Sequence, residues 1–153
     1  MSKDANPFKK CLSKFATGIT VVSGKQDDRY WGITVNSFNS VSLDPKLILF
    51  SIQKTSYHVN FFTVGQACTV SILNEKQQAV SNIFASHKEL SYQNFFIEKK
   101  GINGIIKDCC AFFFCHVHKV HEGGDHNIIL CSVQEFELLS DSKPLLYYNG
   151  QYF

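Results

Sequence analysis

A lysine and two hydroxyl side chains stand together where the sequence predicts that a helix begins. Lys54, Thr55 and Ser56 precede residues 57–64, and Gly65 follows them. Serine suits the N-cap of a helix and glycine its C-terminal end, so the pattern predicts a helix over 57–64. A helix N-terminus offers unpaired N–H groups and the positive end of the dipole, and the lysine adds a charge. The group is suited to an anion the size of a phosphate; the alternative is an ordinary helix cap beside a solvated lysine.

Amide and hydroxyl side chains also crowd residues 34–40, at the end of a strand that is otherwise apolar. The segment runs Thr-Val-Asn-Ser-Phe-Asn-Ser. Such groups can hydrogen-bond the edge of a flat heterocycle, which carries both donors and acceptors. The commoner alternative is that they bond their own backbone, as asparagine and serine often do in turns. The sequence leaves both interpretations open.

Cysteine and histidine side chains gather late in the chain, at Cys115, His116, His118, His121 and His126. The side chains of His116 and His118 share one face of a predicted strand. Zinc binds both residue types, but paired CxxC or HxxxH spacing is absent and no four-ligand set can be written. We therefore predict no metal site and exposed strand histidines. His126 follows a Gly-Gly-Asp turn, where a side chain either leans over a cleft or has no role beyond the turn.

The elements that must position these groups are mostly strands. Asn6, Pro7 and an apolar face at residues 8, 11, 12 and 15 predict an N-terminal helix ending at Gly18. A sequence resembling a capping box at 74–77 predicts a second helix behind it. Residues 86–107 are expected to be loops and short turns. Strands are predicted over 19–23, 30–35, 46–52, 67–73, 111–121, 127–139 and 144–148. Many strands joined by short turns favour an antiparallel barrel with helices outside it over a βαβ sheet.

Composition limits the classes of protein to consider. A chain of 153 residues with 44% hydrophobic and 18% charged residues predicts a single globular domain over 1–153. A net charge of +2 gives no electrostatic case for a nucleic-acid protein. No apolar run approaches the roughly 20 residues of a membrane helix, and no apolar segment suggests a secretory signal. The six cysteines are therefore expected to be thiols in the cytoplasm. The GxGxxG, GxxxxGK[ST], GxSxG and HExxH motifs are all missing.

Several motifs occur in an order that resembles one known family. Residues 15–22 (FATGITVV) resemble F-x-T-G-V-x-V-V. Residues 32–45 (GITVNSFNSVSLDP) and then 47–50 (LILF) resemble G-x-T-x-N-S-F-x-S-V-S-L-D-P-P-L-x-L-F. Shorter matches follow at 84–86, 124–126 and 144–148. Together they resemble the flavin reductase-like family, the short-chain NAD(P)H:flavin oxidoreductases. The resemblance implies a mainly β fold with a few flanking helices, an antiparallel, Greek-key-like split β-barrel that binds FMN.

The resemblance also implies roles for individual residues. His126 would lie near the nicotinamide as the catalytic residue. Thr34, Asn36 and Ser37 would line the isoalloxazine ring, and Tyr148 would close the site, with the partner subunit of a homodimer as its source. Ser51, Lys54, Thr55 and Ser56 would hold the ribityl chain and phosphate, and Ser81 and Phe84 would pack near the flavin. The full flavin-binding set would be Thr34, Val35, Asn36, Ser37, Ser51, Ile52, Lys54, Thr55, Ser56, Ser81, Phe84 and Tyr148.

The function that the resemblance implies is hydride transfer from NADH or NADPH to FMN, with FAD as a second choice of flavin. The reduced flavin would then serve a partner monooxygenase. Arginine usually meets the 2′-phosphate of NADPH, and Arg29 is the only arginine in the sequence, so NADH is the expected donor. An alternative function is that of an FMN-binding electron carrier or storage protein with the same fold and no significant NAD(P)H activity.

Overall fold

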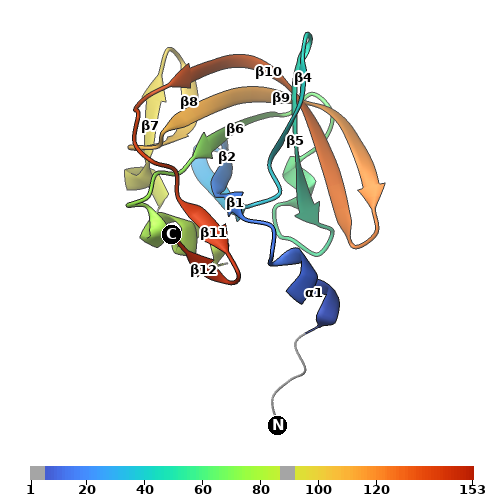
Figure 1. The fold of residues 1–153 in the computed structure, drawn as a ribbon. Coiled ribbons are helices and arrows are strands. Elements are labelled where there is room, and N and C mark those ends of the chain that lie inside the picture. The colour runs from blue at the N-terminus through green and yellow to red at the C-terminus, as the bar shows by residue number, and fades with distance from the viewer. Residues whose placement is uncertain (1–5, 87–91) are drawn as a thin grey trace.

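The protein is described by a computed structural model that covers residues 6–86 and 92–153. Seven strands of the described chain form one antiparallel sheet that curls on itself (Figure 1). Its strands, in spatial order, are β3 (Arg29–Val35), β2 (Thr20–Gln26), β6 (Ala67–Ile72), β9 (Ala111–Gly123), β10 (His126–Leu138), β5 (Lys46–Gln53) and β4 (Asn39–Leu43). β3 and β4 stand at the two ends of this order, and β3 approaches β5 without pairing to it. The predicted antiparallel split barrel is confirmed.

A core lies on each face of the sheet around β2, because successive apolar side chains along the strand point to opposite faces. In β2, Val22 points into the core enclosed by the barrel, and its neighbour Val21 points into a second core outside it. Both are fully buried. The inner core also holds Phe50 and Trp31. The β2–β3 hairpin ends in a two-residue turn at Asp27 and Asp28, whose φ angles are 48° and 61°. Positive φ angles at both turn residues give a turn whose twist matches the right-handed twist of the two strands.

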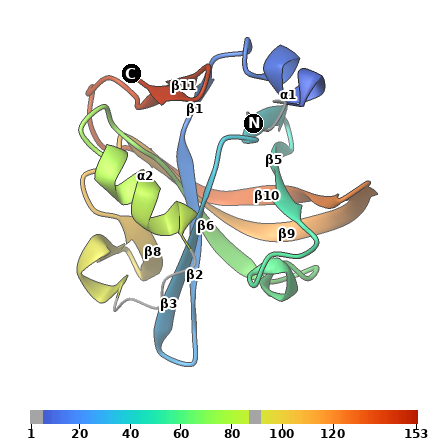
Figure 2. The same cartoon turned by 90° about the horizontal axis from the view of Figure 1, so that it is seen from below.

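The outer core is covered by a helix and a small hairpin. Helix α2 (Gln78–Ala85) lies against β3, as Figure 2 shows, and buries Phe84. The 3₁₀ helix η2 (Tyr92–Phe95) leads into the hairpin of β7 (Phe96–Lys99) and β8 (Ile102–Ile106). We predicted only loops and turns between 86 and 107, so this hairpin was missed, and residues 87–91 of that segment lie outside the described part. The β8 segment INGII has no clear alternation, because Ile105 and Ile106 are both apolar and both buried.

The N-terminal helix begins as predicted but is shorter. Helix α1 spans Pro7–Leu12, and its N-cap Asn6 accepts a hydrogen bond from the backbone N–H of Phe8 at 2.9 Å. Residues 1–5, where we expected no secretory signal, are not described. Beyond the helix, the short strand β1 (Thr17–Gly18) pairs with β11 (Leu146–Tyr148), which pairs with β12 (Gln151–Tyr152). The apolar face of α1 is exposed, contrary to the usual place of such a stripe.

The predicted helix over 57–64 is wrong. Only the single-turn 3₁₀ helix η1 (Val59–Phe61) forms there. Phe62, which follows it, has φ −106° and ψ 65°, outside the helical region, and its ring packs edge-on against Trp31 and Phe50. Core packing of the aromatic side chain therefore outweighs the capping signals. In the described part of the chain, no helix has the length and apolar character needed to span a membrane.

The contact between Gly32 and Phe84 yields a stability prediction. A Cβ atom at position 32 would lie 2.7 Å from Phe84 Cδ1 and 3.3 Å from Val21 Cγ1, so Gly32→Ala must displace packed core atoms. We expect a loss of about 1–3 kcal/mol in the free energy of unfolding, measured by urea denaturation. Gly18→Ala is the matched control, because nothing lies within 4 Å of a Cβ there. Equal stability of the two variants would contradict the packing argument.

Candidate functional site

A cleft of about 300 Å³ lies where the barrel is split. It is bounded by the end of β3, the end of β5, the start of β10 and the last residue of α2. Its lining residues are Ile33, Thr34, Val35, Asn36, Ser37, Ser51, Ile52, Gln53, Ser56, Ala85 and His126. Eight of the thirteen residues expected at a site are thus brought to one place from three separate segments. The arrangement follows from topology, because the chain leaves β3 beside the cleft and returns along β5 on its other side.

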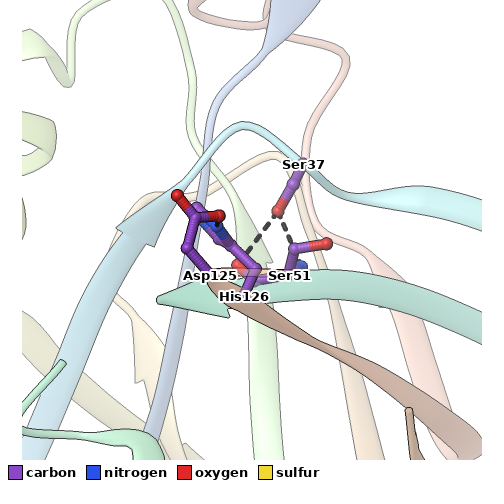
Figure 3. A network of polar contacts seen from close by, with 4 residues as sticks. All are labelled: Ser37, Ser51, Asp125 and His126. Atoms are coloured by element: carbon purple, nitrogen blue, oxygen red, sulfur yellow. Dashed lines mark hydrogen bonds and ion pairs between the residues drawn. The ribbon is translucent and has the colours of Figure 1, made fainter. Parts of the chain in front are cut away.

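The connection between β3 and β4 is fixed to β5 by one side chain. Asn39 pairs with Leu49, so continuing that register brings Ser37 opposite Ser51. The Ser37 hydroxyl accepts a hydrogen bond from Ser51 N at 2.8 Å and donates to Ser51 O at 3.3 Å (Figure 3). A side chain thereby replaces the two main-chain bonds of a ladder. The Ser37 hydroxyl thus orders the cleft wall. Its proton is donated to Ser51 O and not to a ligand.

The β3 side of the cleft is tied to α2 and the C-terminal hairpin. The Thr34 hydroxyl donates to Ser81 O at 2.7 Å. The Ser81 hydroxyl shares a 2.9 Å hydrogen bond with the Tyr152 hydroxyl, which donates to Asn82 Oδ1 at 3.2 Å. Ser81 is fully buried, so its hydroxyl faces this network behind the wall. Asn36, by contrast, is exposed in the cleft and offers both an amide donor and an amide acceptor.

The turn over 53–56 carries the expected anion-binding groups. Ser56 N donates to Gln53 O at 2.9 Å, and Lys54 N donates to Asp125 O at 2.9 Å, which fixes the turn against the β9–β10 hairpin. The helix dipole that we invoked at this point is absent, because the following η1 has only three residues. What remains is a tight turn with a cation and two hydroxyl groups. The Lys54 ammonium lies 3.6 Å from Glu122 Oε1.

His126 faces the cleft beside an acidic neighbour. It opens β10 opposite Gln53, and its Nδ1 lies 2.6 Å from Asp125 Oδ1 (Figure 3). The hydrogen bond and charge of His126, with Lys54 adding positive charge, hold the pKa of Asp125 below its ordinary value. The carboxylate is therefore ionised at neutral pH, so Nδ1 is the donor and Nε2 is left to face a ligand. We name Lys54, Glu122, Asp125 and His126 the charged rim.

Comparison with known proteins decides the family. Residues 12–153 match the model of the flavin reductase like domain. The chain belongs to this family. The match covers every segment that lines the cleft.

Named relatives and solved members of the flavin reductase family match nearly the whole chain. The reductase component of 4-hydroxyphenylacetate 3-monooxygenase from Thermus thermophilus is 34% identical over 148 residues, covering 95% of this chain and 93% of that protein. The FMN reductase (NADH) of Agrobacterium fabrum is 31% identical over 151 residues, covering 98% and 86%. The NADH:FAD oxidoreductase of Streptomyces globisporus, solved with NAD and FAD fragments, superposes with a TM-score of 0.88 at 28% identity, covering 100% and 93%.

Not every residue that the family resemblance implied lines the cleft. Lys54 and Thr55 lie in the adjoining turn. Ser81 and Phe84 lie behind the wall, where the Phe84 ring packs against Phe95 and Phe96 in the outer core. Tyr148 stands on β11 and is 37% exposed. Their contact with flavin stays a prediction.

Three cleft residues were missed by sequence reasoning. Ile33 and Gln53 could have been found, because each is two positions from a proposed site residue on the same strand face, Val35 and Ser51 respectively. Ala85 carries no chemical signal of its own. It reaches the cleft only because α2 ends there.

The cysteines and strand histidines lie elsewhere. Cys68, Cys109, Cys110, Cys115 and Cys131 are buried and all six cysteines are free thiols. Burial raises the pKa of the Cys109 thiol to about 11, which leaves it protonated and a poor nucleophile at neutral pH. Within the described ranges, no three His, Cys, Asp or Glu side chains are placed to share a metal ion. The absence of a metal site stays a prediction.

The double hydrogen bond of Ser37 yields a local prediction. In Ser37→Ala the Ser51 N–H loses its partner, at a cost of about 1–2 kcal/mol, so its amide should exchange with solvent several-fold faster. Hydrogen exchange followed by NMR measures this directly. Ser37→Thr keeps a hydroxyl and should retain protection, and Ser40→Ala, at an exposed position in β4, serves as the matched control. Unchanged exchange of Ser51 in Ser37→Ala would contradict the role we give this side chain.

Proposed function

We propose that this protein is an NAD(P)H:flavin oxidoreductase that reduces FMN, with FAD as a second substrate, and passes the reduced flavin to a partner monooxygenase. One observation carries the proposal: the split of a flavin reductase fold gathers Asn36, Ser51 and His126 in one cleft beside Lys54. The names of the relatives support both halves of the proposal, since one is a monooxygenase reductase component and another an FMN reductase (NADH).

The chemistry of the cleft fits a flavin. The half-buried Ile33 offers an apolar surface to a planar ring, and the exposed Asn36 amide suits the polar edge of the ring. The adjoining turn supplies Lys54, Thr55 and Ser56 for a phosphate. A volume of about 300 Å³ is at the lower limit for a ligand site, which suits a ring with its ribityl phosphate extending along the turn.

Bound flavin supplies the redox chemistry by accepting a hydride from reduced nicotinamide, and the protein supplies binding and orientation. The chain accordingly needs no strong general base. Asp125 fixes the ring of His126, and Nε2 of that ring is then available to donate or accept at the nicotinamide side of the cleft. Donors at the cleft, above all the Asn36 amide, would stabilise negative charge on a reduced ring.

The position of Arg29 supports NADH as the donor. Arg29 opens β3 at the hairpin end, and Val35 ends it beside the cleft. Six residues of strand separate them by about 20 Å. The cleft lining therefore holds no arginine, the side chain that usually meets the 2′-phosphate on the adenosine ribose of NADPH, and we propose NADH as the donor on that ground.

We also propose a single domain over 1–153 that forms a homodimer in the cytoplasm. An exposed apolar surface supports the dimer: Phe8, Leu12 and Phe15 near the N-terminus are 68%, 56% and 78% exposed. They continue into the C-terminal hairpin, because Asn149 N donates to Ser13 O at 3.0 Å. Tyr148 lies in that hairpin, so a second copy on this surface would bring Tyr148 near an interface. The free thiols suit a reducing compartment.

The proposed activity is tested by NADH oxidation with purified protein and FMN, FAD, riboflavin or no flavin. We expect turnover only with flavin, and loss of NADH absorbance measures it.

In His126→Ala, kcat should fall at least tenfold while the Kd for flavin changes less than twofold, because the residue faces the nicotinamide side. Asp125→Asn is the companion variant, which removes the carboxylate charge beside the ring and keeps a side-chain oxygen there as an acceptor for Nδ1–H. Flavin binding without NADH or NADPH oxidation would favour the electron-carrier function instead, and unchanged turnover in His126→Ala would remove that residue from the reaction.

The proposed dimer is tested by light scattering. A charge placed on the apolar face of α1, as in Leu12→Glu, should convert a dimer to a monomer, because an unpaired carboxylate is costly to bury. Leu43→Glu is the control, since Leu43 is 88% exposed and lies in β4, away from α1. A monomeric wild-type protein would contradict the proposal, and a dimer disrupted only by Leu43→Glu would move the interface to β4.

A further inference from the structure

The charged rim contains two carboxylates in a place where phosphate-bearing ligands are expected. Glu122 Oε1 lies 3.6 Å from Lys54 Nζ, and Asp125 Oδ1 lies 2.6 Å from His126 Nδ1. Both carboxylates come from the end of the β9–β10 hairpin. A site that only attracts anions would not carry two negative charges beside its two cationic or titratable groups.

The two carboxylates are not equivalent. Asp125 is engaged by a short hydrogen bond to His126, which accounts for its presence as the group that orients the ring. Glu122 makes only a longer ion pair, and its side chain is 89% exposed. It is therefore able to swing away from Lys54 at little cost, and a ligand phosphate is able to replace it.

The sheet register fixes where Glu122 stands. Glu122 is paired with Asn127, and Asn127 is paired with Ile52, so the three residues form one row across β9, β10 and β5. Lys54 follows Ile52 by two residues, in the turn whose backbone is bonded to Asp125 O. The carboxylate at position 122 is thus held by the barrel itself within reach of the lysine.

We propose that Glu122 is a specificity-determining residue that competes with the flavin phosphate for Lys54. The inference rests on the proposed function and deepens it. The competition weakens binding of phosphate-bearing flavins and leaves riboflavin, which has no phosphate, unaffected. Weaker binding of the flavin suits an enzyme whose reduced flavin must dissociate and reach another protein.

Removing the charge at position 122 should therefore tighten the binding of FMN and leave the binding of riboflavin unchanged. In Glu122→Gln we expect the Kd for FMN to fall about threefold at low salt, the size expected for an exposed ion pair, and the Kd for riboflavin to stay constant. The gain should shrink as salt screens the charges. In a Lys54→Met background the same substitution should change the Kd for FMN by less than 1.5-fold, because the group for which Glu122 competes is gone.

The experiment is a fluorescence titration of FMN and of riboflavin with the full chain as wild type, Glu122→Gln, Lys54→Met and the double variant. Glu135→Gln is the matched control, an exposed glutamate in β10 far from the cleft, which changes the net charge equally. A riboflavin-to-FMN ratio of Kd values that rises in Glu122→Gln alone, and only with Lys54 present, supports the proposal. The proposal is overturned if the ratio is unchanged, if it rises equally in Glu135→Gln, or if the rise persists in the Lys54→Met background. In each of these cases flavin still binds, so the proposed function stands. Failure of the wild type to bind either flavin overturns both.

Discussion

The cleft depends on the Ser37 hydroxyl group, which makes the two hydrogen bonds to Ser51 that a paired backbone would otherwise make. Where the register of β4 and β5 would bring Ser37 opposite Ser51, the main chain has already turned away, and the Ser37 side chain makes both bonds instead. The sheet is thereby kept open between β3 and β5 without leaving the end of β5 unsatisfied. If the backbone pairing had continued, a strand would occupy the space that the eleven lining residues now surround.

The strands and the fold class could be predicted from the sequence because they depend on apolar alternation and on a long motif. The β2–β3 hairpin, β5, β6 and the long β9–β10 pair follow the predicted segments, with ends displaced by a few residues. The helix over 57–64 could not be predicted correctly, since capping residues report local preference, and the position of Phe62 is set by Trp31 and Phe50 from other strands. The same holds for the apolar face of α1, whose spacing indicates burial without saying what covers it.

The candidate site shows the same division. Residues in the long motif, Thr34 to Ser37, could be assigned together because a strand end keeps its neighbours close. The resemblance placed Ser81 with them, but its hydroxyl serves Tyr152 behind the wall, a contact between residues 71 positions apart that no local pattern reveals. Glu122 carries no motif at all. Its relation to Lys54 exists only through the row that joins β9, β10 and β5.

The presence of a core on each face of the sheet limits how such a chain can change its length during evolution. Val21 and Val22 serve opposite cores, so inserting or deleting one residue within β2 would exchange the two sets of side chains and leave both cores wrong. Lengthening is tolerable where the chain leaves the sheet, for example at the turn of Asp27 and Asp28 and at the tip of the β9–β10 hairpin. The tip carries Glu122 and Asp125 of the charged rim, so a change of length there would alter the rim and leave both cores of the barrel intact.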